Sequence, residues 1–205
     1  KTQKPLKANI ELVDNSTGQI IQTFQSDPVS GKYLVSLPSG KNYGIAVKSE
    51  GYLFHSENFD IPKASGYREY EKNVDLKKIE VGKAIVLRNI FFDLAKYSLR
   101  PESKTELDRL HKLMIENPTL KIELSGHTDT RGSSSSNKTL SENRAKAVVE
   151  YLTGKGISAS RMVAKGYGEE KTIVSDSEIA KMLTKEEKEE GHQQNRRTEF
   201  KILEK

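Results

Sequence analysis

The chain has 205 residues, 34% of them hydrophobic and 31% charged, and its 34 basic and 29 acidic side chains leave a net charge of +5. This length suits one large or two modest domains, and the absence of cysteine excludes disulfides and thiolate metal sites. Residues 1–83 carry 12 basic and 10 acidic groups and residues 84–205 carry 22 and 19, so the dense basic stripe of a nucleic-acid-binding protein is missing. No apolar stretch approaches the roughly 20 residues that a membrane-spanning helix needs, so no span is expected in this chain.

Residues 1–82 are predicted to form a small all-β domain, a β-sandwich. Short runs rich in Val, Ile, Tyr and Phe alternate with turn clusters that contain Asn, Asp, Pro and Gly. These runs recur about every ten residues and show no helical period, which favours a sandwich. The predicted strands cover residues 8–13, 20–24, 32–37, 42–48 and 52–59, with a sixth near 72–76.

Two motifs in this region carry a resemblance. An Asp-x-x-Thr-Gly turn at residues 14–18 follows the first strand, and residues 31–40 read Gly-Lys-Tyr-Leu-Val-Ser-Leu-Pro-Ser-Gly. On these residues the region resembles the carboxypeptidase regulatory-like, transthyretin-like modules, which implies a spacer or a unit that binds an envelope protein partner. Tyr52, Phe54 and His55 could mark a partner patch, but their pattern favours core and strand packing.

From about residue 84 the pattern changes to alternating strands and helices. Pro101 suits a first helical turn, Ser103 and Glu106 have the spacing of a capping box, and the apolar residues that follow recur at helical spacing. A β-α-β-α-β-β order over residues 83–205 predicts a mixed sheet with helices on one face, and therefore an α+β chain as a whole. The predicted strands are 84–91, 120–125, 161–165 and 197–203, and the predicted helices are 101–116 and 137–153.

The segment before the last strand, residues 173–194, interrupts this order. Ser177 could cap a short helix there, and the run Glu-Glu-Lys-Glu-Glu at residues 186–190 is typical of a solvated surface. We therefore favour a solvated face over a site for a partner molecule at this run.

A polar loop between the second strand and the second helix carries the charges of a candidate binding site. Asp129 lies in this loop, and Arg144 lies on the helix on the same side as Leu140. A helix N-terminus offers free N–H groups and partial positive charge, which favour a carboxylate. One carboxylate facing a guanidinium forms a receptor for a zwitterion, with an ammonium on Asp129 and a carboxylate on Arg144.

Seven sequence blocks in residues 84–203 carry a second and closer resemblance. The region resembles the OmpA-like peptidoglycan-binding domain, shared by outer membrane protein A, the peptidoglycan-associated lipoprotein and flagellar stator proteins. The blocks are Asn89-Ile90-Phe91-Phe92-Asp93, Gly126-His127-Thr128-Asp129-x-x-Gly132, Asn137-x-x-Leu140-Ser141-x-x-Arg144-Ala145-x-x-Val148-x-x-Tyr151-Leu152, Gly156-Ile157, Arg161, Gly166-Tyr167-Gly168 and Asn195-Arg196-Arg197-x-Glu199.

This resemblance implies non-covalent peptidoglycan binding through the diaminopimelate residue of the stem peptide, with no cofactor and no metal. Asp129 is expected to bind the ammonium of that residue, and Arg144 its carboxylate. The other expected ligand-binding residues are Asn137, Leu140, Asp93, Arg131, Thr128 and Arg196. The domain would then anchor an outer-membrane protein of a Gram-negative cell to the wall, on the periplasmic face of that membrane.

Several simpler interpretations remain open for single residues. Asp129 could only cap a turn, Asn137 could be only the helix cap, and Arg196 and Arg197 could tie the last strand to the sheet. A lone histidine such as His127 beside a strand end is more often a structural group than a ligand.

Two other classes of protein compete with the anchor. An enzyme would need a nucleophile, a base and an orienting group in a recognisable pattern, but there is no Gly-x-Ser-x-Gly and the four histidines lack metal-ligand spacing. We therefore expect no catalysis. The alternative function is an envelope scaffold that acts through its β-sandwich and has only a weak wall site.

Overall fold

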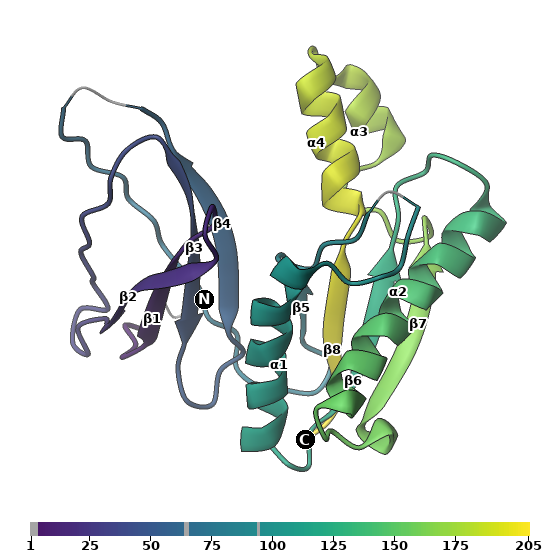
Figure 1. The fold of residues 1–205 in the computed structure, drawn as a ribbon, viewed down its shortest axis with the longest axis horizontal. Helices are drawn as coiled ribbons and strands as arrows, with labels where there is room; N and C mark the ends of the chain where they lie inside the picture. The colour runs from purple at the N-terminus through teal and green to yellow at the C-terminus, as the bar shows by residue number, and fades with distance from the viewer. Residues whose placement is uncertain (1–3, 64–65, 94) are drawn as a thin grey trace. The chain divides into compact units, whose positions relative to one another are not determined.

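The computed structural model describes residues 4–63, 66–93 and 95–205, and it divides the chain into two compact units (Figure 1). The first unit is Lys1–Ile79 and the second is Glu80–Lys205. Among the described residues, no helix is both long enough and apolar enough to cross a membrane.

The first unit contains one antiparallel sheet with the strand order β2-β1-β3-β4. The expected strands at 8–13, 20–24 and 42–48 are confirmed, while the expected strand at 52–59 begins later, because its ladder with β3 starts at His55. Phe54 is buried, as core packing requires. The observed bounds are β1 Asn9–Asp14, β2 Gln19–Gln25, β3 Lys41–Lys48 and β4 His55–Ile61.

The predicted strands at 32–37 and 72–76 are wrong, and the β-sandwich of a carboxypeptidase regulatory-like module is not confirmed. Both segments alternate partly buried and exposed residues, but neither forms a hydrogen-bonded ladder in the described residues. Instead, the Tyr33 hydroxyl donates to the Lys72 carbonyl at 2.8 Å. Alternation reports one apolar face of an extended segment, whereas a strand also needs a neighbouring backbone. Residues from these two segments cover one core cluster of the sheet, namely Tyr33, Val35, Leu37, Val74 and Leu76.

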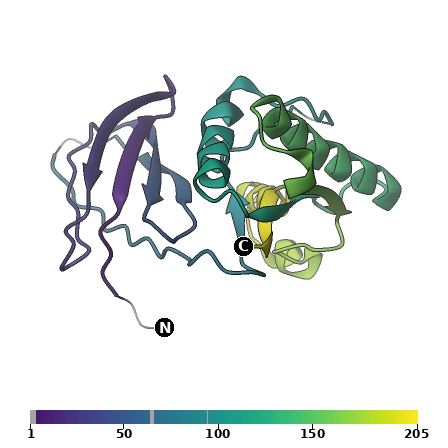
Figure 2. The same cartoon turned by 90° about the horizontal axis from the view of Figure 1, so that it is seen from below.

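The second unit contains a mixed sheet with the order β5-β8-β6-β7, in which only β6 and β7 are parallel. Its strands are β5 Ala84–Leu87, β6 Lys121–His127, β7 Met162–Gly168 and β8 Thr198–Glu204. The long helices α1 (Lys104–Glu116) and α2 (Ser134–Gly154) lie on the same side of this sheet (Figure 2). The expected α+β class and mixed sheet are therefore confirmed.

The first strand of this unit is shorter than the expected 84–91. Leu87 pairs with Thr198, which is the first residue of β8, so the ladder ends where its partner strand begins. Ser103 does not form the expected capping box with Glu106. Its hydroxyl donates to the Phe91 carbonyl (3.1 Å) and accepts from the Phe91 N–H (2.8 Å), which ties the segment after β5 to the start of α1.

Helix α2 starts at Ser134, before the expected residue 137, because the Ser133 hydroxyl accepts a hydrogen bond from the Ser136 N–H and caps the helix. Asn137 is therefore not the helix cap. Two glycines let the helix lie directly on the strands. A Cβ on Gly126 would come within 2.2 Å of the Ser141 carbonyl oxygen, and one on Gly166 within 2.4 Å of the Glu142 nitrogen.

The segment between β7 and β8 forms two helices, α3 (Asp176–Lys181) and α4 (Lys185–Asn195). Ser175 and Thr184 cap them through complete capping boxes with Glu178 and Glu187, so the expected cap at Ser177 is wrong. Helix α4 leads directly into β8 (Figure 1). We call residues 173–195 the excursion.

Candidate functional site

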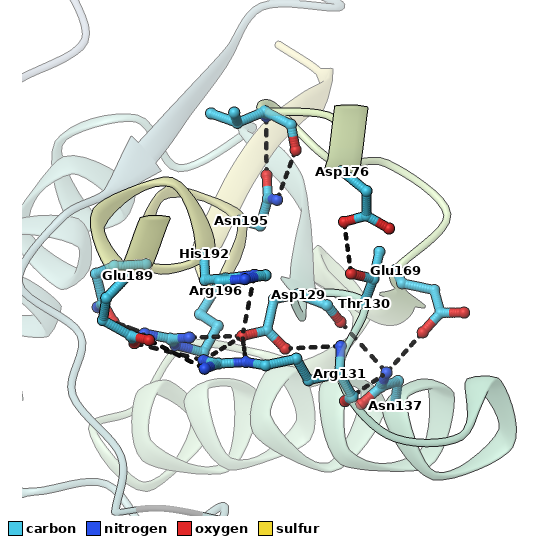
Figure 3. Close-up of polar contacts among 12 residues, drawn as sticks. Asp129, Thr130, Arg131, Asn137, Glu169, Asp176, Glu189, His192, Asn195 and Arg196 are labelled. Atoms are coloured by element: carbon cyan, nitrogen blue, oxygen red, sulfur yellow. Dashed lines mark hydrogen bonds and ion pairs between the residues drawn. The ribbon is translucent and has the colours of Figure 1, made fainter. Parts of the chain in front are cut away.

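Asp129 lies in the loop after β6, and its carboxylate contacts two arginines (Figure 3). Arg131 donates to Oδ2 from Nε (2.9 Å) and from Nη2 (2.7 Å), and Arg196 donates to the same oxygen from Nη1 (2.5 Å). Burial alone would raise the pKa of Asp129, but the hydrogen bonds from Arg131 and Arg196 outweigh burial and hold it below its usual value. The carboxylate is therefore charged at neutral pH, although its side chain is only 8% exposed.

The loop around Asp129 is fixed by hydrogen bonds to its backbone groups. The Thr128 N–H donates to the Gly168 carbonyl at 2.9 Å. Buried Asn137, in the first turns of α2, donates from its amide to the carbonyls of Asp129 (3.3 Å) and Arg131 (3.2 Å). Gly132 closes the loop at φ +103°, a conformation that other residues rarely adopt. Asn137 therefore holds the loop in place, with its amide nitrogen already engaged.

Arg144 lies two turns further along α2, against the segment that follows β5. Its guanidinium donates to the Lys96 carbonyl from Nε (3.0 Å) and to the Asp93 carbonyl from Nη2 (3.4 Å), and it lies 4.9 Å from the centroid of the Phe92 ring. These contacts orient one edge of the guanidinium. Nη1 makes no hydrogen bond within the described part of the chain.

The electrostatic environment of Arg144 favours an anion. Burial and the neighbouring positive charge of Arg196 lower the pKa of Arg144, and the charge of Asp129 raises it. Asp129 and Arg144 therefore lie within range of each other's charge, although they make no direct contact. A guanidinium that is desolvated and placed near a second one gains stability from any carboxylate that binds it.

Two residues of α4 belong to this cluster and were not predicted. The Glu189 carboxylate accepts from Arg131 Nη1 (3.0 Å) and from Arg196 Nη2 (2.6 Å), and His192 Nδ1 lies 4.0 Å from Asp129 Oδ2. Glu189 is half exposed, as the prediction of a solvated run requires, but its contacts with the two arginines were not predicted. The capping-box spacings Ser175-x-x-Glu178 and Thr184-x-x-Glu187 could have predicted the two helices, but no sequence pattern places Glu189 beside the arginines.

The remaining predicted residues lie around this centre in different ways. Asp93 is exposed, and its carboxylate pairs with Lys96 at 3.4 Å while its carbonyl meets Arg144. Leu140 is half-buried on α2, and Thr128 is buried. Arg197 has the structural role that the sequence left open, since it bonds Glu199 and the carbonyls of Asn195 and Lys171.

His127 is the last residue of β6, two residues before Asp129. It is buried and stacks on Tyr167, with ring centroids 5.3 Å apart. Burial, together with the charge of Arg197, lowers its pKa to about 4, so the ring is neutral at neutral pH.

The model of the OmpA family matches residues 91–186. This match lies within the second unit, which therefore resembles the domains of that family. Over 114 residues the chain is 37% identical to photosystem I P700 chlorophyll a apoprotein A2 of Gloeobacter violaceus. The aligned region covers 56% of this chain and 13% of that protein. It is 31% identical over 114 residues to outer membrane porin F of Pseudomonas fluorescens, covering 56% of this chain and 32% of the porin. It is 34% identical over 91 residues to the peptidoglycan-associated lipoprotein of Rhizobium meliloti, and the aligned region covers 44% of this chain and 52% of the lipoprotein.

The chain thus spans about half or less of the length of these curated relatives. The expected resemblance to the OmpA family is confirmed over residues 91–186.

Proposed function

We propose that the OmpA-like domain binds peptidoglycan without covalent chemistry and anchors an envelope protein to the cell wall. The family model, and relatives named outer membrane porin F and peptidoglycan-associated lipoprotein, support this function. The observation that carries it is the pairing of a buried, charged Asp129 with a desolvated Arg144 whose charges interact.

The ligand that fits this pairing is the side-chain end of diaminopimelate, which carries an ammonium and a carboxylate. Oδ2 of Asp129 already accepts from two arginines, whereas Oδ1 accepts only from the Arg131 N–H among the described residues, so the ammonium would bind Oδ1. The carboxylate would bind the part of the Arg144 guanidinium that is not held by the Lys96 and Asp93 carbonyls. Leu140 would line the site, with Asp93 at its rim, and the Thr128 backbone would support the loop.

The energy of such a site is limited. A hydrogen bond to a charged group contributes roughly 1.5–3 kcal/mol before the cost of ordering the ligand. A few of these bonds correspond to a Kd of about micromolar or weaker. Many copies on one envelope would still hold it firmly to the wall, because rebinding at a polymeric ligand is intramolecular. Equilibrium binding of this strength is therefore sufficient for an anchor.

The proposed ligand favours a location on the periplasmic side of the outer membrane of a Gram-negative cell. Peptidoglycan lies there, and the matched porin is named as an outer membrane protein. Residues 1–82 would form a separate module before the wall-binding domain at 83–205.

The first unit offers a second candidate function, the binding of an envelope protein. Its edge strand β2 exposes Ile20 and Ile21, at 54% and 46%. An exposed edge strand with apolar side chains can pair with an extended segment of another protein. A scaffold of this kind would leave the wall site weak or unused.

Calorimetric titration with a diaminopimelate-containing stem peptide, and with its lysine analogue as control, tests the wall-binding proposal. Lysine keeps the ammonium but lacks the carboxylate, so we expect binding to the first peptide and little to the second.

Asp129→Asn should lose binding with an unchanged circular dichroism spectrum, because it removes a charge but keeps the side-chain shape. Arg144→Lys should not restore wild-type affinity, since a point charge cannot replace a planar fork. Equal affinity for both peptides, or wild-type binding by Asp129→Asn, would refute the proposal.

A further inference from the structure

Helix α4 places the Glu189 carboxylate on the outward side of the Arg131 and Arg196 guanidinium groups (Figure 3). Arg131 contacts Asp129 through Nε and Nη2, and Glu189 through Nη1 and Nη2. Arg196 contacts Asp129 through Nη1 and Glu189 through Nη2. The two carboxylates and two guanidinium groups thus form a closed ring in which the charges alternate.

The excursion that carries Glu189 is held by two contacts within it and one contact to the loop beside Asp129. Buried Asn195 accepts from the N–H groups of Ile173 and Val174 through one side-chain oxygen, at 2.7 and 3.0 Å. The Thr130 hydroxyl, in the loop beside Asp129, donates to Asp176 at 2.7 Å. Gly191 lets α4 pack against α3, because a Cβ there would lie 2.9 Å from Ile179 Cγ1. The position of Glu189 over the arginines therefore follows from the fold of the excursion.

The two arginines do not need Glu189 to stay in place. Asp129 holds both of them, and Gln193 Oε1 accepts from Arg196 Nε and Nη2 as well. Glu189 and Arg131 are about half exposed, with 54% and 53% of their side chains accessible. The Glu189–Arg131 pair is open to solvent, while Arg196 is only 24% exposed. Because solvent reaches the Glu189 carboxylate, a carboxylate from a ligand can approach the same guanidinium groups and exchange with it.

We infer that Glu189 is an internal competitor that occupies the Arg131–Arg196 pair in the free protein and is displaced by a carboxylate of the bound stem peptide. This inference rests on the proposed function and adds a second anionic contact to it, beside the one at Arg144. A stem peptide carries free carboxylates in addition to the one at the diaminopimelate side-chain end. The excursion therefore sets the affinity of the site through one residue that is not part of the diaminopimelate contact.

The full chain can be titrated with the diaminopimelate stem peptide as wild type, Glu189→Gln and Glu190→Gln. Glu190 is the matched control, because it is an exposed glutamate on the same helix without an ion pair among the described residues. We expect Glu189→Gln to lower the Kd roughly fivefold, because the binding-competent fraction of the arginine pair rises. Glu190→Gln should stay close to wild type. If Glu189→Gln binds with the same affinity as Glu190→Gln, or more weakly than wild type, the inference that Glu189 competes with the ligand is wrong.

A second ligand separates competition from a general change of charge. In a peptide whose carboxylates are amidated, except at the diaminopimelate side-chain end, the displaced contact is absent. The gain from Glu189→Gln should then disappear, and a gain that persists would count against the inference. If wild type fails to distinguish diaminopimelate from lysine, the proposed function itself fails. If wild type does distinguish them but Glu189→Gln gives no gain in affinity, only the inference about Glu189 fails.

Discussion

At the scale of single residues, the site depends on how charge is compensated. Asp129 is buried and charged because two guanidinium groups donate to it, and Arg144 is desolvated between backbone carbonyls and the Phe92 ring. The signature residues could be predicted from their spacing in the sequence. Glu189 and His192 could not, because they lie about sixty residues from Asp129 along the chain, and only the fold brings Glu189 to Arg131 and His192 to Asp129.

His127 gives the protein a predictable sensitivity to acid. Its pKa falls from the ordinary 6.5 to about 4 in the folded chain, through burial first and then the charge of Arg197. The unfolded state therefore binds more protons as the pH falls from about 6.5 to about 4, and stability decreases across that window and not above it. The expected loss is about 3 kcal/mol once both states are protonated.

Replacing the histidine by a neutral side chain tests this contribution. His127→Gln should shift stability at all pH values through lost stacking on Tyr167, but should flatten its decline between about pH 6.5 and 4. Urea unfolding of both proteins at several pH values measures the difference. Parallel curves for the two proteins would assign the acid sensitivity to other groups.

At the scale of elements, the contact between α2 and the strands positions the loop. Gly126 and Gly166 remove the side chains that would otherwise separate helix and sheet, and the Ser141 hydroxyl accepts from the Gly168 N–H at 2.8 Å. This close approach brings Asn137 to the carbonyls of the Asp129 loop. The chain thus couples the packing of a helix to the geometry of the proposed binding site.

Gly126→Ala should destabilise the second unit by roughly 1–3 kcal/mol, because its methyl group would overlap the Ser141 carbonyl and force the helix away from the sheet. The matched control is Gly154→Ala at the exposed end of the same helix, where nothing lies within 4 Å of the added Cβ. That change should be neutral or stabilise by up to about 1 kcal/mol through helix propensity. Chemical denaturation compares the two, and equal stabilities would show that the helix can shift freely.

At the scale of the whole molecule, the chain combines two units with separate cores. Every residue placed in the site, including those of α4, lies within Glu80–Lys205. A fragment of residues 80–205 should therefore unfold cooperatively and bind the diaminopimelate stem peptide with the affinity of the full chain. Calorimetry on both proteins makes the comparison. Weaker binding by a folded fragment would assign part of the site to the first unit.

The sequence by itself determined the α+β class, the order of the four strands and two long helices in the second unit, and the loop in which the proposed site lies. Local periodicity and motif spacing are sufficient for these features, because they depend on neighbours along the chain. Only the tertiary structure decided that residues 32–37 and 72–76 cover a sheet without joining one, since a strand requires a distant backbone partner. It also decided that Glu189 lies on the arginines of the site, because side chains distant in the sequence meet only when the excursion folds across the loop.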